Sequence, residues 1–212
     1  MRGGFPRAYL AGSNQKSMLW RKEFIRTFVE RDLPQLGFRI ESRSIERFWA
    51  MLAHYHGQLW SASEFGRAFG VADHTVRRYL DLLTQTFMVR QLQPWHENLA
   101  KRQVKAPKIY LADSGILHAL IGAASMDDLE RHPRVGASWE GFVLHEVIRR
   151  LAARPEECHF WRTHAGAELD LLVIRDGRRR GFEFKRTEAP SLTPSVRSAM
   201  IDLKLDRLDV IH

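Results

Sequence analysis

Acidic residues near the C-terminus are spaced as two facing strands would require. Residues 166–186 read GAELDLLVIRDGRRRGFEFKR, with apolar runs on both sides of Asp176-Gly177. This dipeptide accepts the positive φ angles of a two-residue hairpin turn, so the pattern predicts two antiparallel strands. With Asp176-Gly177 as the loop, Asp170 pairs with Glu183 across the hairpin.

Side chains alternate between the two faces of each predicted strand. We expect the core face to carry Leu169, Leu171, Val173, Phe182 and Phe184, and the other face to carry Glu168, Asp170, Glu183 and Lys185, with Glu168 opposite Lys185.

The polar face has the groups needed for metal-dependent chemistry. Cross-strand partners have Cβ atoms about 4.5–5.5 Å apart, so the carboxylates of Asp170 and Glu183 can grip one divalent cation. Hard oxygen ligands without Cys or His favour Mg²⁺ or Mn²⁺. A metal with Lys185 beside it suits phosphodiester hydrolysis, in which the metal polarises the phosphate and the lysine orients or helps to activate water. The alternative is a solvated face on which Glu168 and Lys185 form an ordinary ion pair.

The flanking segments predict the elements that would hold this hairpin. A helix is expected over 137–153, a short strand over 157–163, a helix over 193–203 opened by Thr193-Pro194, and a last strand over 207–211. The order helix, three strands, helix, strand indicates an α/β fold with a mixed sheet.

On these residues the chain resembles the PD-(D/E)XK nuclease superfamily, whose restriction-endonuclease-like core has the order αβββαβ. Asp170 matches the first acid, Glu183-Phe184-Lys185 matches the (D/E)XK element, and Glu140 matches the helix acid, while Leu169 replaces the motif's Pro. The resemblance implies that Asp170, Glu183 and Glu140 are metal ligands and that Lys185 acts on the attacking water. Glu168, opposite Lys185 in the predicted hairpin, is expected to hold Lys185.

A second resemblance covers nearly the whole chain. The segments YLDLLTQTFMVRQLQPW, KAPKIYLADSGIL, WEGFVLHEV, ELDLL and FEFK are similar to a C-terminal domain of unknown function found in bacterial and archaeal AAA-type ATPases. That family implies a P-loop ATPase module, then a winged-helix-like region, then a nuclease-like domain. The chain has no G-x-x-x-x-G-K-[ST] motif, so we expect a fragment or a shortened relative. The expected ranges are 1–56 for a helical lead-in that ends an ATPase-type module, 57–121 for the winged-helix-like region and 137–212 for the nuclease-like domain, with the boundary near 122–136.

The middle of the chain has the pattern of a helix-turn-helix. Ser63 is expected to cap a first helix, Gly70 to end it, and Asp73 to cap a second helix. We expect nucleic-acid contacts from this second helix and from the connector that follows, through His74, Thr75, Arg77, Arg78, Lys101, Arg102 and Lys105. Arginines without Asn or Gln favour phosphate contacts over base reading. The alternative is a helix-turn-helix that packs against protein.

Composition indicates an anionic partner. The formal net charge is +8 and the sequence pI is about 10.0, which favours nucleic acid, here DNA. The single Cys158 allows no internal disulfide and fits the cytoplasm. No apolar run approaches the roughly 18 residues that cross a bilayer, so no membrane partner is expected.

Two functions from different classes follow from these observations. The first is the DNA-binding C-terminal part of an AAA-type ATPase-related protein, with a Mg²⁺-dependent nuclease site. The second is a non-cleaving nucleic-acid or protein interaction module that serves the missing ATPase motor.

Overall fold

The computed structural model describes residues 1–38, 40–97, 102–188 and 193–212. Lys101, one of the predicted nucleic-acid contacts, lies outside the described residues. The chain forms two compact units: unit 1 comprises Met1–Arg90 and Ile109–Ser138, and unit 2 comprises Gln91–Lys108 and Trp139–His212. The division passes through two strands and one helix, and the three domain ranges expected from the sequence stay predictions.

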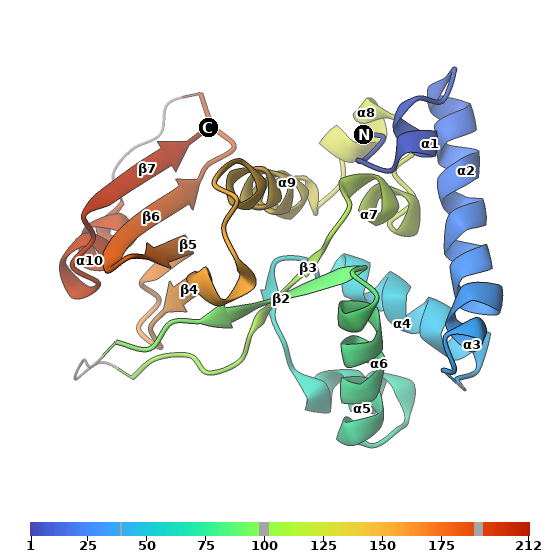
Figure 1. Ribbon diagram of the computed structural model, residues 1–212, viewed down its shortest axis with the longest axis horizontal. Helices are drawn as coiled ribbons and strands as arrows, with labels where there is room; N and C mark the ends of the chain where they lie inside the picture. The colour runs from blue at the N-terminus through green and yellow to red at the C-terminus, as the bar shows by residue number, and fades with distance from the viewer. Residues whose placement is uncertain (39, 98–101, 189–192) are drawn as a thin grey trace. The chain divides into compact units, whose positions relative to one another are not determined.

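Unit 1 is mainly helical (Figure 1). Its elements are α1 (Pro6–Tyr9), α2 (Asn14–Thr27), η1 (Phe28–Asp32), α3 (Leu33–Gln35), α4 (Ser42–His54), β1 (Gln58–Leu59), α5 (Ala62–Phe69), α6 (Asp73–Gln85), α7 (Ser114–Leu120) and α8 (Met126–Glu130). The elements shared between the units are β2 (Val89–Pro94), β3 (Lys108–Leu111) and α9 (Val135–Arg150).

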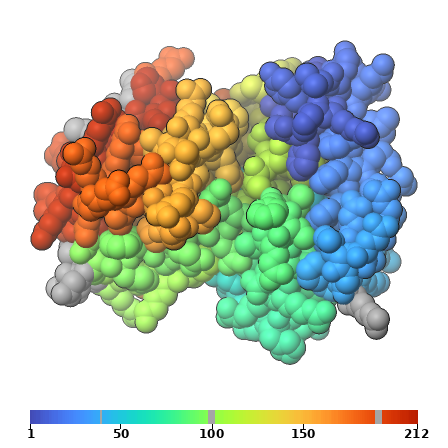
Figure 2. All heavy atoms as spheres, viewed as in Figure 1, coloured from blue at the N-terminus to red at the C-terminus, as the bar shows by residue number. Residues whose placement is uncertain are grey.

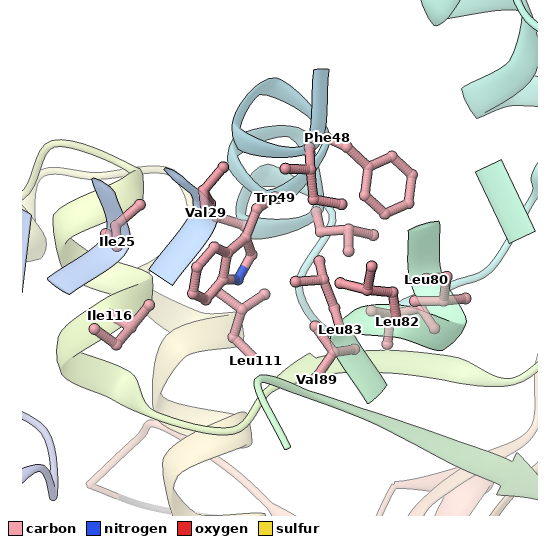
Figure 3. Packing of buried hydrophobic residues seen from close by; sticks show 14 of the residues in the cluster. Ile25, Val29, Phe48, Trp49, Leu80, Leu82, Leu83, Val89, Leu111 and Ile116 are labelled. Carbon is pink, nitrogen blue, oxygen red and sulfur yellow. The ribbon is translucent and has the colours of Figure 1, made fainter. Parts of the chain in front are cut away.

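The core of unit 1 joins segments that are distant in the sequence. Helix α4 buries Ile45, Phe48, Trp49 and Leu52, a spacing that places apolar side chains on one helical face. Figure 3 shows Trp49 between residues of other elements, including Leu111 of β3. The helical lead-in and the helix-turn-helix segment therefore share one hydrophobic core.

The helix-turn-helix is present, with different caps from those expected. Ser61 is the N-cap of α5, where its hydroxyl accepts a hydrogen bond from the Glu64 amide at 3.3 Å, so the prediction of Ser63 is wrong. Ser61 has the extended backbone that a cap requires, whereas Ser63 already lies within the helix. Gly70 ends α5 in the left-handed conformation, as predicted. Ala72 is the N-cap of α6, so Asp73 is not a cap and instead begins the helix, where its carboxylate suits the helix dipole.

Unit 2 contains a mixed sheet, and this confirms the predicted α/β fold class. Its remaining elements are η2 (Pro155–Glu157), β4 (Cys158–Arg162), β5 (Glu168–Arg175), β6 (Arg178–Phe184), α10 (Pro194–Asp202) and β7 (Arg207–Ile211). Within unit 2 the strand order is β2-β4-β5-β6-β7. Strands β4, β5 and β6 are antiparallel neighbours, while β2 pairs with β4, and β6 with β7, in parallel. The order α9, β4, β5, β6, α10, β7 is the one expected.

The β5–β6 hairpin has the predicted register from the turn to the pair Leu171–Phe182, where the ladder ends; it does not extend to the predicted pairs Asp170–Glu183 and Glu168–Lys185. Asp176 and Gly177 form the turn with φ angles of 51° and 75°, and Leu171 pairs with Phe182. Both positive φ values match the turn twist that suits a two-residue hairpin. The register therefore follows from the turn chemistry, as the sequence indicates.

The predicted division of β5 into two alternating faces is wrong in part. Leu169 and Leu172 lie in one apolar cluster with Trp161 of β4 and Ala199 of α10, although strict alternation puts them on opposite faces. The pairing of β4 with β5 shifts between His159 and Trp161, where β5 contains one residue more than its partner. Such a bulge turns the following side chains to the other face.

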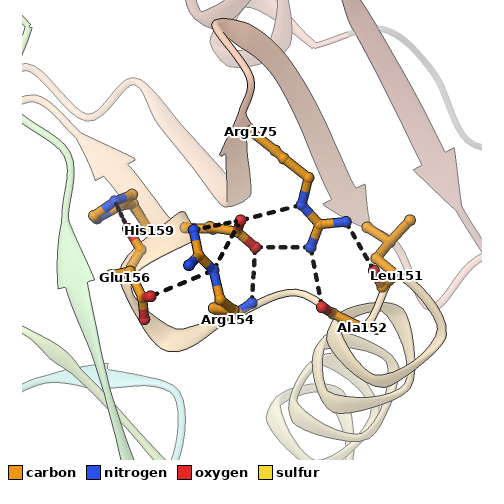
Figure 4. A network of polar contacts seen from close by, with 7 residues as sticks. Leu151, Ala152, Arg154, Glu156, His159 and Arg175 are labelled. Atoms are coloured by element: carbon orange, nitrogen blue, oxygen red, sulfur yellow. Dashed lines mark hydrogen bonds and ion pairs between the residues drawn. The ribbon is translucent and has the colours of Figure 1, made fainter.

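Short polar contacts hold the two helices of unit 2 against β5. Thr193 caps α10, as predicted, and Ser195 Oγ accepts a hydrogen bond from the Glu168 amide at 2.5 Å. At the end of α9, Arg175 of β5 donates to the Leu151 carbonyl at 3.1 Å and pairs with Glu157 at 2.7 Å (Figure 4). The hydrogen bond from Arg175 lowers the pKa of Glu157 to about 2. These contacts position α9, and with it Glu140, relative to β5.

Gly66 allows the two helices of the helix-turn-helix to approach closely, and we expect an alanine there to destabilise the protein. A Cβ at residue 66 would lie 2.9 Å from the Val71 carbonyl oxygen, which is backbone and cannot rotate away. Gly66→Ala is expected to lower the free energy of unfolding by about 1–3 kcal/mol, measured by urea denaturation.

Gly136→Ala is the matched control, because a Cβ at this α9 position meets nothing within 4 Å. It is expected to raise the free energy of unfolding by up to about 1 kcal/mol, since alanine favours a helix over glycine. Equal effects of the two substitutions would contradict the close packing of the turn on Gly66.

Candidate active site

Unit 2 brings together four carboxylates and two ammonium groups. We call Glu140 of α9, Glu168 and Asp170 of β5, and Glu183 of β6 the acidic cluster. The lysines are Lys108, the first residue of β3, and Lys185, which directly follows β6. Because β5 and β6 are neighbours in the predicted register, Asp170 and Glu183 come from adjacent strands.

The two central acids are buried. Asp170 is 8% exposed and Glu183 is 5% exposed, so the solvated hairpin face considered above is excluded for this pair. Asp170 Oδ2 accepts a hydrogen bond from the Phe184 amide at 2.8 Å, which fixes one carboxylate oxygen against β6. Carboxylates are almost never this buried unless something compensates their charge.

Burial, together with the negative charges of Glu140 and Glu183, raises the pKa of Asp170 to about 7 against the opposing effects of Lys108 and of the Phe184 amide hydrogen bond. Asp170 is therefore near its titration point at neutral pH. A carboxyl group in this state gains from any added positive charge, because a cation favours its ionised form.

Lys108 is a partner that the sequence interpretation missed. Its side chain is 4% exposed, and its Nζ atom contacts Glu168 Oε1 directly, with Glu140 Oε1 at 3.4 Å and Asp170 Oδ1 at 3.8 Å. The signal in the sequence was a lysine at the start of the apolar run Ile109–Leu111, where a charge enters a buried strand. A buried lysine almost always has an acidic partner.

Lys185 and Glu168 have different partners from those expected. Lys185 Nζ lies 2.5 Å from Glu183 Oε1, whereas Glu168 pairs with Lys108 and Arg162. The prediction that Glu168 holds Lys185 is therefore wrong.

The protonation state of Lys185 limits its role. Burial lowers the pKa of Lys185, but the hydrogen bond and charge of Glu183, with the charges of Asp170 and Glu140, outweigh this and raise the pKa overall. Lys185 is thus an ammonium ion at neutral pH. It can orient a water molecule or neutralise a phosphate, but it cannot accept a proton.

The donor set fits a hard cation only in part. Glu183 Oε2 is buried without a hydrogen-bond partner among the described residues, as a carboxylate oxygen reserved for a cation would be. Yet within the described ranges no three His, Cys, Asp or Glu side chains are grouped closely enough to hold a metal ion. Glu140 and Asp170 lie within 4 Å of Lys108 Nζ instead, so the three predicted ligands are near one another but not assembled.

The residues predicted to contact nucleic acid fall in both units. On α6 of unit 1, His74, Arg77 and Arg78 are exposed and Thr75 is half-buried. Figure 2 shows the segment of α5 and α6 at the surface of this unit. A hollow of about 300 Å³ adjoins it, lined by Phe38, His74, Arg77, Arg78, Asp81, Leu82 and Gln85. Arg102 and Lys105 are exposed in unit 2.

The helices give no sign of a membrane span. Across the part of the chain that the structure describes, none combines the length and the apolar character needed to cross a bilayer.

Asp170→Asn is expected to remove a pH dependence of stability. The folded protein binds the Asp170 proton more tightly than the unfolded chain, because the pKa is raised from 3.8 to about 7. The contribution of this group to the free energy of unfolding is therefore full below about pH 4 and is lost as the pH rises through 7. The free energy of unfolding is measured by urea denaturation in EDTA at pH 5 and at pH 8. Between these two values it should fall by about 2–3 kcal/mol more in the parent than in Asp170→Asn.

Asp176→Asn serves as the control for this measurement, because Asp176 is exposed at the tip of the same hairpin and asparagine tolerates its positive φ. It should follow the parent at every pH. A parent profile parallel to that of Asp170→Asn would show that Asp170 is already ionised at pH 5.

Comparisons with known proteins identify the families that the chain matches. Residues 1–127 match the family model "Domain of unknown function (DUF8612)", and residues 135–211 match "Domain of unknown function (DUF4143)". The chain is 52% identical over 212 residues to the uncharacterized proteins Rv2008c of Mycobacterium tuberculosis (strain ATCC 25618 / H37Rv) and Mb2031c of Mycobacterium bovis (strain ATCC BAA-935 / AF2122/97). These alignments cover 100% of this chain and 48% of each relative, so the chain spans about half the length of the curated relatives it matches.

A solved structure titled "The crystal structure of transcriptional regulator PA3341" is 21% identical to the chain. The match covers 67% of this chain and 100% of the regulator at a TM-score of 0.27, which supports no conclusion about fold or function.

These matches confirm a domain of unknown function, while the relation to AAA-type ATPases and to nucleases stays a prediction. Since the first family model covers more than half of its residues, the chain belongs to the DUF8612 family, and its C-terminal segment also matches the DUF4143 model.

Proposed function

We propose that this chain is the DNA-binding part of an AAA-type ATPase-related protein and that unit 2 carries a Mg²⁺-dependent phosphodiesterase site. The observation that carries the proposal is the burial of Asp170 and Glu183 on adjacent strands, with Lys185 paired to Glu183. An acid pair excluded from water beside a cationic side chain is costly as a purely structural feature, but useful when it binds a metal and a phosphate.

Each residue has a distinct role in this proposal. Asp170 and Glu183 would hold Mg²⁺, with Mn²⁺ as the substitute, and Glu140 would complete or orient the ligand set. When bound, the metal would polarise the phosphate and stabilise the charge that develops on it. Lys185, an ammonium ion, would orient the attacking water and contact the phosphate. The unpartnered Oε2 of Glu183 supports its assignment as a ligand.

Nucleic acid would be held mainly through its phosphates. His74, Thr75, Arg77 and Arg78 of α6 would contact one segment of backbone, and Arg102 and Lys105, with Lys101, would contribute further positive charge. The net charge of +8 supports an anionic partner. The start of α6 has exposed arginines and no Asn or Gln, which favours contacts with DNA phosphates over contacts with base edges.

A specific observation favours the second candidate, a non-cleaving interaction module. Lys108 already lies within 4 Å of Glu140, Glu168 and Asp170, and Arg162 pairs with Glu168, so the protein itself supplies positive charge to most of the acidic cluster. Such a cluster can be structural. In that case unit 2 would bind nucleic acid or a partner protein, such as an ATPase module, without cutting.

Cleavage assays separate the two candidates. The full chain is incubated with duplex, single-stranded and branched DNA and with RNA, in Mg²⁺, in Mn²⁺ or in EDTA, and the products are resolved on gels. We expect metal-dependent cleavage of DNA that falls by at least about 100-fold in Asp170→Asn and in Lys185→Gln, because each loses a charge that acts on the reacting phosphate.

Asp176→Asn is again the control, since it makes the same chemical change at the exposed tip of the hairpin. Cleavage by Asp176→Asn at the parent rate supports the enzyme. Equal DNA binding by the parent, Asp170→Asn and Lys185→Gln, with no cleavage under any condition, supports the module instead.

Salt dependence tests the proposed DNA contacts of α6. The double variant Arg77→Gln/Arg78→Gln should bind duplex DNA more weakly, to a similar degree for unrelated sequences. The slope of log K against log salt should fall in magnitude by about 2, because two phosphate contacts are lost. Fluorescence anisotropy at several salt concentrations measures both.

Arg7→Gln/Lys16→Gln is the matched control, because both residues are exposed in unit 1 and the change in charge is the same. An equal loss of affinity in the control would show that net charge, not α6, accounts for binding.

A further inference from the structure

We propose that the Lys108 ammonium occupies the position of a divalent cation in the acidic cluster, so that Lys108 controls how tightly the site binds metal. This inference rests on the proposed metal site and concerns its regulation. It assigns a role to Lys108 of β3, which lies outside the hairpin and outside α9 and which the sequence analysis did not place in the site.

The surroundings of Lys108 are those of a bound cation. Its Nζ atom contacts Glu168, lies 3.4 Å from Glu140 Oε1 and 3.8 Å from Asp170 Oδ1, and lies 5.6 Å from the centre of the Phe160 ring. Three carboxylates and an aromatic face all attract positive charge. With only 4% of the side chain exposed, water screens these attractions little.

Lys108 and a metal would compete for the same oxygen atoms. Two of its three carboxylate partners, Glu140 and Asp170, are proposed ligands. Magnesium requires ligand oxygens at about 2.0–2.1 Å, so these carboxylates would have to leave Lys108 and converge on the ion. An ammonium ion and a divalent cation a few ångströms apart also repel each other strongly in a site of low dielectric. Metal entry therefore requires Lys108 to withdraw from Glu140 and Asp170.

Glu183 is the ligand that Lys108 leaves available. Its Oε1 atom pairs with Lys185, and its Oε2 atom is buried without a hydrogen-bond partner among the described residues. Lys108 thus offsets part of the negative charge of Glu140, Glu168 and Asp170, whereas Glu183 keeps one oxygen without a hydrogen-bond partner among the described residues. This asymmetry explains why the predicted ligands lie close together without forming a three-ligand group in the described part of the chain.

Lys185 provides the matched comparison. It carries the same charge beside the same cluster, but its side chain is 36% exposed and its ion pair is with Glu183. Replacing Lys185 removes a nearby positive charge without vacating the position between Glu140 and Asp170. Comparing substitutions of the two lysines therefore distinguishes two effects on metal affinity: the loss of a positive charge near the acidic cluster, and the removal of the ammonium group that lies between Glu140 and Asp170.

The test measures Mn²⁺ binding by the full chain with isothermal titration calorimetry and electron paramagnetic resonance. The variants are the parent, Lys108→Met, Lys108→Arg and Lys185→Met. Lys108→Met should bind Mn²⁺ at least about tenfold more tightly than both the parent and Lys185→Met, because the competing charge has been removed from the site itself. Lys108→Arg keeps the charge and should stay close to the parent.

Adding Asp170→Asn to Lys108→Met should abolish the gain, which places the tighter Mn²⁺ at this cluster. If parent and Lys108→Met bind one Mn²⁺ ion equally well, the inference is overturned while the proposed metal site stands. If neither binds Mn²⁺ at a single site, the metal site and the inference both fail.

Lys108→Met leaves buried carboxylates uncompensated and can unfold the protein in EDTA. Far-ultraviolet circular dichroism then provides the readout. Recovery of the folded signal by Mn²⁺, with Lys108→Arg folded throughout, supports the inference. An unfolded signal at saturating Mn²⁺ contradicts it.

Discussion

The balance of charge within the acidic cluster is the constraint on which unit 2 depends. Glu140, Glu168, Asp170 and Glu183 come from a helix and two strands and are largely removed from water, so their mutual repulsion opposes the packing that brings them together. Lys108 offsets this repulsion at Glu140, Glu168 and Asp170, and Lys185 offsets it at Glu183. The raised pKa of Asp170 indicates that they do so incompletely. A cluster with this residual strain gains from any further positive charge, whether a proton or a metal ion.

The same constraint relates the two candidate functions to each other. A nuclease-like site and a structural ion cluster contain the same carboxylates and differ in which cation neutralises them. In the structure Lys108 lies within ion-pair distance of Glu140, Glu168 and Asp170. One oxygen of Glu183 has no hydrogen-bond partner in the described chain. Under the two proposals made above, the choice between a metal-dependent enzyme and an interaction module is a competition between the Lys108 ammonium and a divalent cation for the same carboxylates.

Unit 1 has a simpler physical basis. Its helices pack around Phe48 and Trp49, and Gly66 lets α5 meet the turn before α6 at a distance that a larger residue would prevent. This packing fixes the face that α6 turns outward, with His74, Arg77 and Arg78 exposed. The surface that the proposal assigns to DNA phosphates is thus a consequence of a hydrophobic core on the opposite side of the same helix.

The features that the sequence determined by itself are turns and helix ends, which depend on residues adjacent in the chain. Asp176-Gly177 set the hairpin and its register, Thr193-Pro194 set the start of α10, and Gly70 set the end of α5, because each depends on the backbone preferences of adjacent residues. The α/β class and the element order followed from hydrophobic periodicity. The cap of α5 was misplaced by two residues, because Ser61 and Ser63 can both cap a helix, and that of α6 by one residue, because Ala72 at the N-cap position has no side chain that signals a cap.

Only the tertiary structure decided the state of the site. Glu168 pairs with Lys108 and Arg162 and not with Lys185, and no signal within residues 166–186 indicates this. Lys108 is far from Glu140 and Asp170 in the sequence, and their proximity depends on how the chain packs. Burial, which raises the pKa of Asp170, is likewise a property of the packed unit. The sequence by itself determined which groups could do chemistry, and long-range packing decided which cation they face, because charge, burial and partner are set by residues that are neighbours in space and not along the chain.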